Sequence, residues 1–101
     1  MSDEYEIIIT QKAEDDFTQI YFHLAYVLLR PDLANNVKEK IQNKINGLSY
    51  MPYRFREYGI DDLRIALVPF YKIIYSVSEI EKKVFIVRII YSLSDDTNLI
   101  C

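Results

Sequence analysis

Three basic side chains fall on consecutive predicted strands in the C-terminal part of the chain, where together they could bind a phosphate group. Arg64, Lys72 and Arg88 each interrupt an apolar stretch, and fixed cations stabilise the negative charge that develops when a phosphate reacts. Tyr91 ends the last of these strands. A tyrosine with its ordinary pKa of about 10 is a poor base at neutral pH but can donate a proton. These four residues are the catalytic candidates, and Glu57 in the preceding irregular segment is a further candidate base.

Alternation along the strands predicts that two of these cations lie on the same side of a sheet. Arg64 and Lys72 each alternate with an apolar row, and successive side chains of a strand point to opposite faces. The rows are Leu63, Ile65 and Leu67 in the first strand and Tyr71, Ile73 and Tyr75 in the second. If both rows face the core, Arg64 and Lys72 converge on the other side and can share one phosphate. Arg88 comes from the third strand, although it shares its face with apolar residues.

Each of these residues also has a purely structural interpretation. Arg64 and Lys72 could be solvated on an open sheet face, as is common in antiparallel sheets. Arg88 could form an ion pair with a carboxylate such as Asp95, and Tyr91 could be a core or edge aromatic. The sequence leaves both interpretations open.

The elements that position these side chains follow from apolar periodicity and from helix breakers. We expect strands at residues 5–10, 63–68, 71–77 and 84–91, a helix at residues 11–29, and an irregular segment at residues 50–62. A second helix is expected between Pro31 and Ser49, because apolar residues recur there at helical spacing and Pro52 follows. Thr10 is placed to cap the first helix.

The element order β-α-α-β-β-β predicts an α+β fold. We expect a mainly antiparallel four-stranded sheet that is packed on one face by a two-helix hairpin. With 101 residues, the chain is expected to form a single domain over residues 1–101. Its first residues show no signal-peptide pattern and no run of residues is apolar enough to span a bilayer, so we expect a cytoplasmic protein with no membrane partner.

Composition limits the kinds of site that the chain can build. A single cysteine, Cys101, and a single histidine, His23, predict no disulfide, no structural zinc site and no cofactor or metal. The net charge is −3, but residues 38–72 carry seven Lys or Arg against four Asp or Glu. A local basic patch is therefore compatible with an acidic protein. Aromatic residues between Tyr50 and Tyr58 could stack on bases, but we expect them to pack over the core edge or to bind a partner chain.

Five sequence motifs occur in order along the chain. They are Lys12-Ala13 through Phe17, Leu48 with Pro52, Leu63-Arg64-Ile65, Tyr71 through Val77, and Val84 through Tyr91. No single motif is specific, but the ordered set resembles the RelE/ParE superfamily of bacterial toxins over about residues 5–96. The resemblance implies the toxin half of a type II toxin–antitoxin system, with a cognate antitoxin protein as its partner.

Two activities are implied by this resemblance. RelE-like members enter the ribosomal A site and cleave mRNA, whereas ParE-like members inhibit DNA gyrase, and the shared fold does not choose between them. Metal-free RNA cleavage needs a base for the 2′-hydroxyl, an acid for the leaving oxygen and cations for the phosphorane. By resemblance, Arg64 and Lys72 occupy phosphate-binding positions, and Tyr91 occupies the position of a His or Tyr general acid.

Two positions depart from the RelE-like pattern. Leu93 stands where many members carry an arginine, and Ala66 stands where a second basic residue is expected. Loss of a group that stabilises the transition state costs about 10²–10³-fold in rate. The departures and the acidic net charge weaken the RNA-cleavage hypothesis, because a ribosome-directed toxin must approach an anionic surface.

Three hypotheses follow from the sequence. The leading one is an endoribonuclease that cleaves mRNA on the ribosome without a metal, through Arg64, Lys72, Arg88 and Tyr91. The second is a ParE-like inhibitor of DNA gyrase without catalysis, and the third is a degenerate toxin that only binds its antitoxin. In each case we expect a disordered antitoxin segment to fold along an apolar groove of the sheet and helices.

Overall fold

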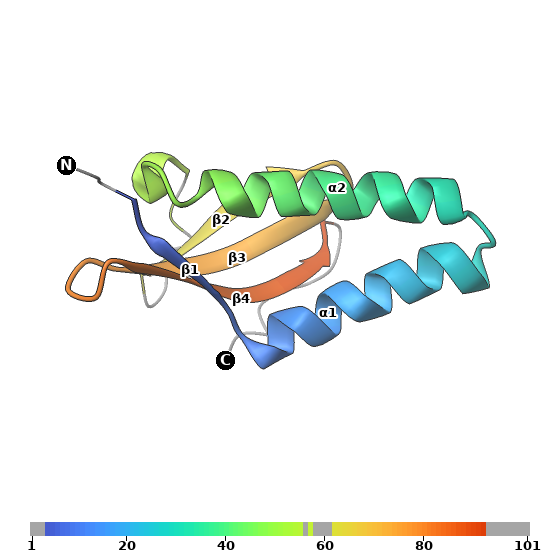
Figure 1. Cartoon of the computed structure of the whole chain (residues 1–101), viewed down its shortest axis with the longest axis horizontal. Coiled ribbons are helices and arrows are strands. Elements are labelled where there is room, and N and C mark those ends of the chain that lie inside the picture. Colours follow the sequence, from blue (N-terminus) through green and yellow to red (C-terminus); the bar gives the residue numbers. More distant parts are fainter. Residues whose placement is uncertain (1–3, 56, 58–61, 93–101) are drawn as a thin grey trace.

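The computed structural model describes residues 4–55, 57 and 62–92 (Figure 1). In chain order the elements are β1 (Glu6–Ile9), α1 (Gln11–Phe22), the π-helix η1 (His23–Val27), α2 (Pro31–Gly47), the 3₁₀ turn η2 (Pro52–Arg54), β2 (Leu63–Val68), β3 (Tyr71–Ser78) and β4 (Lys83–Tyr91). The predicted order of strands and helices is confirmed, and the predicted bounds of the strands agree within one residue at each end.

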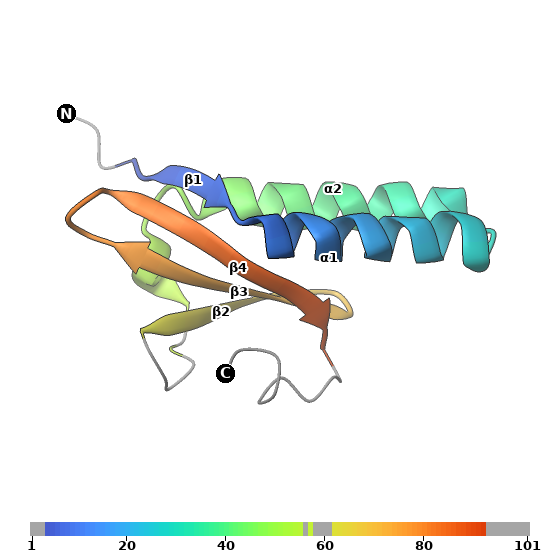
Figure 2. The same cartoon turned by 90° about the horizontal axis from the view of Figure 1, so that it is seen from below.

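The four strands form one sheet in the order β1-β4-β3-β2. Strands β2, β3 and β4 pair antiparallel through short turns. The helix hairpin returns the chain to the end of the sheet where β1 begins, so β2 runs parallel to β1. After two reversals β4 has the same direction, and it pairs parallel with β1. The sheet is therefore mixed but mainly antiparallel. Both helices lie on the same face of it (Figure 2), which confirms the predicted α+β architecture.

Thr10 begins α1 and also ties it to the sheet. Its side-chain oxygen accepts a hydrogen bond from the backbone N–H of Ala13 at 3.2 Å, as an N-cap does. Its hydroxyl also donates to the carbonyl oxygen of Ile86 at 2.7 Å. Because Ile86 lies in β4, the cap sets the position of α1 beside that strand, and α1 is seen alongside β4 in Figure 1.

The first helix does not continue as a regular α-helix to residue 29. From His23 to Val27 it widens into a π-helix, in which the N–H of Leu28 donates to the carbonyl oxygen of His23, five residues earlier, at 2.9 Å. A wider turn changes which side chains face the core. The connection then ends at Pro31, the first residue of α2, where its missing N–H costs no helical hydrogen bond.

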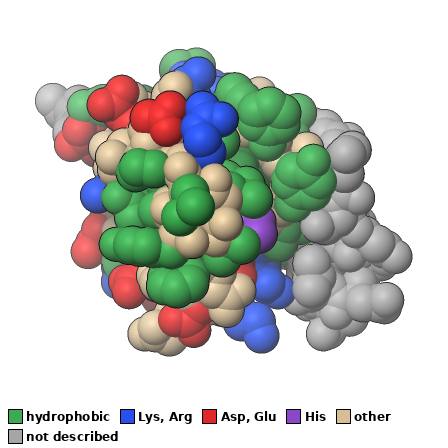
Figure 3. Space-filling view, turned by 90° about the vertical axis from the view of Figure 1, so that its right-hand side faces the viewer, with side chains coloured by type: hydrophobic (Ala, Val, Ile, Leu, Met, Phe, Trp, Pro, Cys, Tyr) green, Lys and Arg blue, Asp and Glu red, His purple; other side chains and the backbone are tan. Residues whose placement is uncertain are grey.

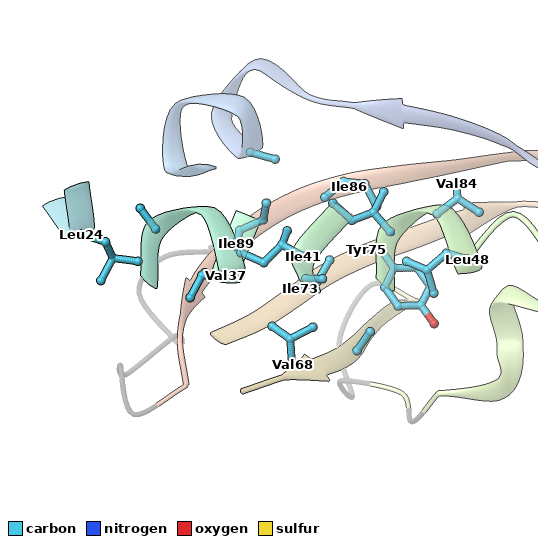
Figure 4. Packing of buried hydrophobic residues seen from close by; sticks show 14 of the residues in the cluster. Leu24, Val37, Ile41, Leu48, Val68, Ile73, Tyr75, Val84, Ile86 and Ile89 are labelled. Carbon is cyan, nitrogen blue, oxygen red and sulfur yellow. The ribbon is translucent and has the colours of Figure 1, made fainter. Parts of the chain in front are cut away.

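The main core lies between the helices and the sheet (Figure 4). Most of its large, fully buried side chains come from α2 and the three antiparallel strands, and burying a large aliphatic side chain contributes about 1.5–3 kcal/mol. They include Ile41, Ile73, Tyr75, Val84 and Ile86. The buried hydroxyl of Tyr75 donates to the carbonyl oxygen of Pro52 at 2.6 Å, so the core also fixes the start of η2.

The assignment of the two faces of β2 differs from the prediction. Ala66 and Val68 pack in the helix-side cluster, whereas Leu63 and Ile65 join Ile74 in a second apolar cluster on the other face. Both rows of β2 are apolar apart from one arginine, so alternation alone separates two faces without showing which one the helices cover.

Candidate functional site

Arg64 lies on the helix side of β2 and holds the segment that precedes the strand. Its Nη1 donates to the carbonyl oxygens of Tyr53 and Phe55 at 3.1 and 2.8 Å, and its Nη2 forms an ion pair with Glu57 at 3.3 Å. The guanidinium also lies over the Tyr53 ring, 5.0 Å from its centre. These contacts satisfy two backbone carbonyls of an irregular segment. Glu57, the candidate base, is the ion-pair partner of Arg64.

Lys72 lies on the opposite face of the sheet from Arg64. In the β2–β3 register Lys72 is opposite Leu67, whereas Arg64 is opposite Tyr75. Residues directly opposite one another share a face, and Tyr75 belongs to the helix-side core. The prediction that Arg64 and Lys72 converge on one phosphate is therefore wrong, because the apolar row of β2 faces away from the helices.

Arg88 forms a bidentate ion pair with Asp16 of α1. Its Nε and Nη2 donate to the two carboxylate oxygens at 2.7 and 2.9 Å, and both side chains are only 13 % exposed. The carboxylate of Asp16 raises the pKa of Arg88. Arg88 therefore forms an ion pair, as its structural interpretation predicted, but the partner is Asp16. Asp95, the carboxylate that the sequence suggested, lies outside the described residues, and so does Leu93.

Tyr91 is an exposed aromatic residue at the end of β4. Its ring meets that of Tyr71 edge to face, with 6.0 Å between the ring centres. Burial raises the pKa of Tyr71, and Tyr91 adds to this effect. The structure therefore does not bring the four catalytic candidates to one point: Arg64 and Arg88 bind protein acceptors in separate places, Lys72 is on the other face, and Tyr91 is at a strand end.

An apolar groove with a volume of about 1010 Å³ opens where the helix hairpin extends past the end of the sheet. Helical side chains form one wall and the strand ends form the other. The lining includes Phe22, Val27, Leu28, Leu33, Phe70 and Tyr91, and the single histidine, His23. Figure 3 shows this end of the molecule, with hydrophobic side chains gathered around that histidine. Such a surface is typical of protein–protein contact.

The sequence predicted an apolar groove of the sheet and helices but not the residues that line it. Val27 and Leu28 continue the apolar stripe of the first helix, a pattern typical of a buried face, but they are 57 % and 51 % exposed. The π-helix and the overhang of the hairpin explain the difference, because the stripe continues beyond the sheet that would cover it. Phe22 and Tyr26, apolar residues that lie off the stripe, were the available signal.

The aromatic segment before β2 packs over the edge of the core. Phe55 packs partly buried against the helix-side cluster, and the hydroxyl of Tyr53 donates to Glu79 at 2.7 Å. Glu79 also accepts from Tyr5 at 2.8 Å and from Lys82 at 2.7 Å. These three hydrogen bonds, that from Lys82 first, lower the pKa of Glu79 to about 2. The bond to Glu79, followed by burial, raises the pKa of Tyr53 to about 12.

Neither a metal site nor a membrane-spanning helix is found in the part of the chain that the structure describes. There, no three His, Cys, Asp or Glu side chains gather to hold a metal ion. None of the helices described is long and apolar enough to cross a membrane.

Known proteins with a similar fold were found by structure comparison. A structure of the chromosomal ParDE toxin–antitoxin system of P. aeruginosa matches with a TM-score of 0.75 and 21 % identity, over 89 % of this chain and 98 % of that chain. The RelBE2 toxin–antitoxin complex of Mycobacterium tuberculosis matches with a TM-score of 0.62 and 19 % identity, over 87 % and 98 %. A double mutant of the E. coli toxin RelE in the free state matches with a TM-score of 0.70 and 13 % identity, over 95 % and 92 %.

Sequence comparison identifies the family. No curated protein sequence matches the chain. Residues 7–95, however, match the family model described as the ParE toxin of the type II toxin–antitoxin system parDE. This match spans every helix and strand except the first residue of β1. The chain therefore belongs to the ParE toxin family and is the toxin of a type II toxin–antitoxin system within the RelE/ParE superfamily.

Proposed function

We propose that this toxin inhibits growth by binding its target protein, with DNA gyrase as the target, rather than by cleaving mRNA. The observation that supports this proposal is the engagement of both candidate arginines by the protein itself. Arg64 donates to two backbone carbonyls, and Arg88 is bidentate with Asp16. A cation that must stabilise a phosphorane needs free donors directed at the substrate.

Recruiting Arg88 for catalysis would carry a large energetic cost. Separating one partner of a well-formed, largely buried ion pair costs on the order of 3 kcal/mol or more, because the other charge is left without compensation. Using Arg64 would likewise leave the carbonyls of Tyr53 and Phe55 without their donor. The same contacts suit a rigid binding protein, in which Arg64 and Arg88 stabilise the fold instead of contacting a substrate. DNA gyrase is the proposed target because the family match is to ParE, and ParE-like members of the superfamily inhibit gyrase.

The cognate antitoxin is proposed to cover the apolar groove at the open end of the helix hairpin. Exposed side chains from α1, η1 and the β2–β3 turn leave a continuous apolar surface there. An amphipathic helix or apolar segment that folds on binding can fill such a groove. Two of the structural neighbours are toxin–antitoxin assemblies, which supports a protein partner of this kind.

Two assays on the purified chain distinguish the proposed activity from mRNA cleavage. We expect the chain to inhibit gyrase supercoiling of a relaxed plasmid and to leave the cleavage pattern of mRNA on programmed ribosomes unchanged. If new ribosome-dependent cuts appear, and if they vanish in a variant that combines Lys72→Ala with Tyr91→Ala, the sequence-based endoribonuclease hypothesis stands and the gyrase proposal fails. Activity in neither assay would support a chain that only binds its antitoxin.

A further inference from the structure

A basic notch lies between α2 and the end of β2, away from the apolar groove. Its volume is about 390 Å³, and the charged side chains that line it are Lys40, Lys44 and Arg54. The last residues of β2, Leu67 and Val68, form its other wall. The proposed antitoxin groove uses none of these side chains.

A single aromatic ring holds two of the three cations together. The ammonium nitrogen of Lys44 lies 5.0 Å from the centre of the Phe55 ring, and the guanidinium carbon of Arg54 lies 4.9 Å from it. Both charges therefore lie beside the same ring. Within the described part of the chain, neither these two cations nor Lys40 has a carboxylate at ion-pair distance. Three like charges that line one notch without a carboxylate partner there attract an anionic group.

The strand beside the notch has an open edge. β2 is the last strand of the sheet. On the outer side of β2, the only backbone pairing among the described residues is an isolated bridge between Arg64 and Glu57. Among the described residues, none pairs with the outward backbone groups of Ile65–Val68, which an added strand can therefore use. Leu67 is 54 % exposed on the face away from the helices. Open strand edges accept extended peptides through main-chain hydrogen bonds.

We propose that this notch binds an extended, acidic segment of a partner protein, which adds to the outer edge of β2 as a fifth strand. Successive side chains of the added strand point to opposite faces. Those on the helix side meet Lys40, Lys44 and Arg54, whereas those on the other side lie beside Leu67. The segment that fits best therefore alternates acidic and apolar residues. The open backbone edge and the apolar Leu67 favour a peptide over a nucleic acid, which would use only the cations. The proposal holds whatever the toxin's target is.

A short peptide tests this proposal on the whole chain, made by cell-free synthesis. The probe is a fluorescein-labelled peptide of eight residues that alternates glutamate and valine. We expect saturable binding that weakens with salt, together with slower amide hydrogen exchange in Ile65–Val68. A peptide with the same composition in two blocks should bind at least about tenfold more weakly, because it cannot present its charges on one face.

Charge-reversal variants of equal net change provide the control. Lys44→Glu combined with Arg54→Glu should reduce binding at least about tenfold. Lys12→Glu combined with Lys38→Glu should leave binding within about twofold, since Lys12 is on α1 and Lys38 lies over the Tyr21 ring. If the reversal variant does not fold by circular dichroism, the glutamine variants of Lys44 and Arg54 replace it.

Three results would overturn the proposal. The first is equal binding of the alternating and block peptides without amide protection in β2, which shows a purely electrostatic surface. The second is an equal loss in the two charge-reversal variants. The third is tighter binding of a single-stranded oligonucleotide than of the peptide at Lys44 and Arg54, which assigns the notch to nucleic acid.

Discussion

The carboxylate of Asp16 joins α1 to β4 through Arg88 and its neighbour. It accepts from Nε and Nη2 of Arg88 at 2.7 and 2.9 Å, and it accepts from the backbone N–H of Ile89 at 3.0 Å. The first helix thereby satisfies a backbone donor of β4 beyond the point where β1 stops pairing with that strand at Ile86. Arg88, one of the three cations that the sequence offered for binding phosphate, is in this way part of the scaffold.

Asp16→Ala should therefore destabilise the protein strongly. We expect the free energy of unfolding to fall by on the order of 3 kcal/mol, because the substitution leaves the largely buried guanidinium of Arg88 unpaired. Urea denaturation followed by circular dichroism measures the change. Glu14→Ala, two positions earlier on an exposed part of the same helix, should shift the value by no more than about 0.5 kcal/mol. Equal effects of the two substitutions would contradict the structural role of Asp16.

Arg64→Ala should loosen the segment before β2 without unfolding the sheet. The carbonyls of Tyr53 and Phe55 lose a shared donor. One of these hydrogen bonds is exposed and the other is partly buried, so each contributes about 0.5–1.5 kcal/mol. Amide hydrogen exchange across residues 53–57 should accelerate at least about tenfold, while exchange in β3 stays slow. Arg64→Lys should rescue little, because one ammonium cannot reproduce the planar fork of the guanidinium. Unchanged exchange in residues 53–57 would show that other contacts hold this segment.

Acid should weaken the contact between the β3–β4 turn and the aromatic segment. The pKa of Glu79 is about 2 in the folded protein, against 4.5 for the free side chain. A depressed carboxyl pKa stabilises the fold above the unfolded value, so this contribution is present above pH 4.5 and is lost as the pH falls towards 2. Urea midpoints measured at pH 6, 4 and 3 should fall less steeply in Glu79→Gln than in the wild type. Glu81→Gln in the same turn should keep the wild-type slope.

Alkaline pH should affect the same contact through Tyr53. The pKa of this tyrosine is raised from 10.0 to about 12, so the unfolded chain loses its phenolic proton first. The stability from Tyr53 is therefore complete below pH 10 and is lost as the pH rises towards 12. Absorbance at 295 nm should show that Tyr53→Phe removes a late-titrating phenol. Loss of an early-titrating phenol instead would contradict the hydrogen bond to Glu79.

A charge in the apolar groove should block antitoxin binding and spare the fold. Val27 is 57 % exposed, so Val27→Asp should change the free energy of unfolding by no more than about 0.5 kcal/mol. If the antitoxin covers the groove, its affinity should fall at least about thirtyfold, as expected for a residue worth about 2 kcal/mol at an interface. Ile80→Asp is the matched control, because Ile80 is 97 % exposed in the turn between β3 and β4. Similar losses in both variants, measured by titration calorimetry, would place the antitoxin elsewhere.

Local patterns in the sequence were sufficient to predict the elements and their order. The N-cap of Thr10, the break at Pro31 and the alternation in Tyr71–Ser78 all act between residues that are close along the chain, so their effects can be read without a fold. The ordered motifs from Lys12 to Tyr91 also predicted the superfamily, which the family match confirms.

Only the tertiary structure decided which residues meet. Both faces of β2 are apolar, so the alternation does not show which face the helices cover. Only the packing of the two rows into two separate clusters shows that Arg64 lies on the helix side. Arg88 pairs with Asp16, which lies 72 positions earlier in the chain, and periodicity carries no information about such a contact. The groove exists because the hairpin is longer than the sheet beneath it (Figure 2). An apolar stripe predicts a buried face, but packing geometry determines how much of that stripe the neighbouring layer can cover.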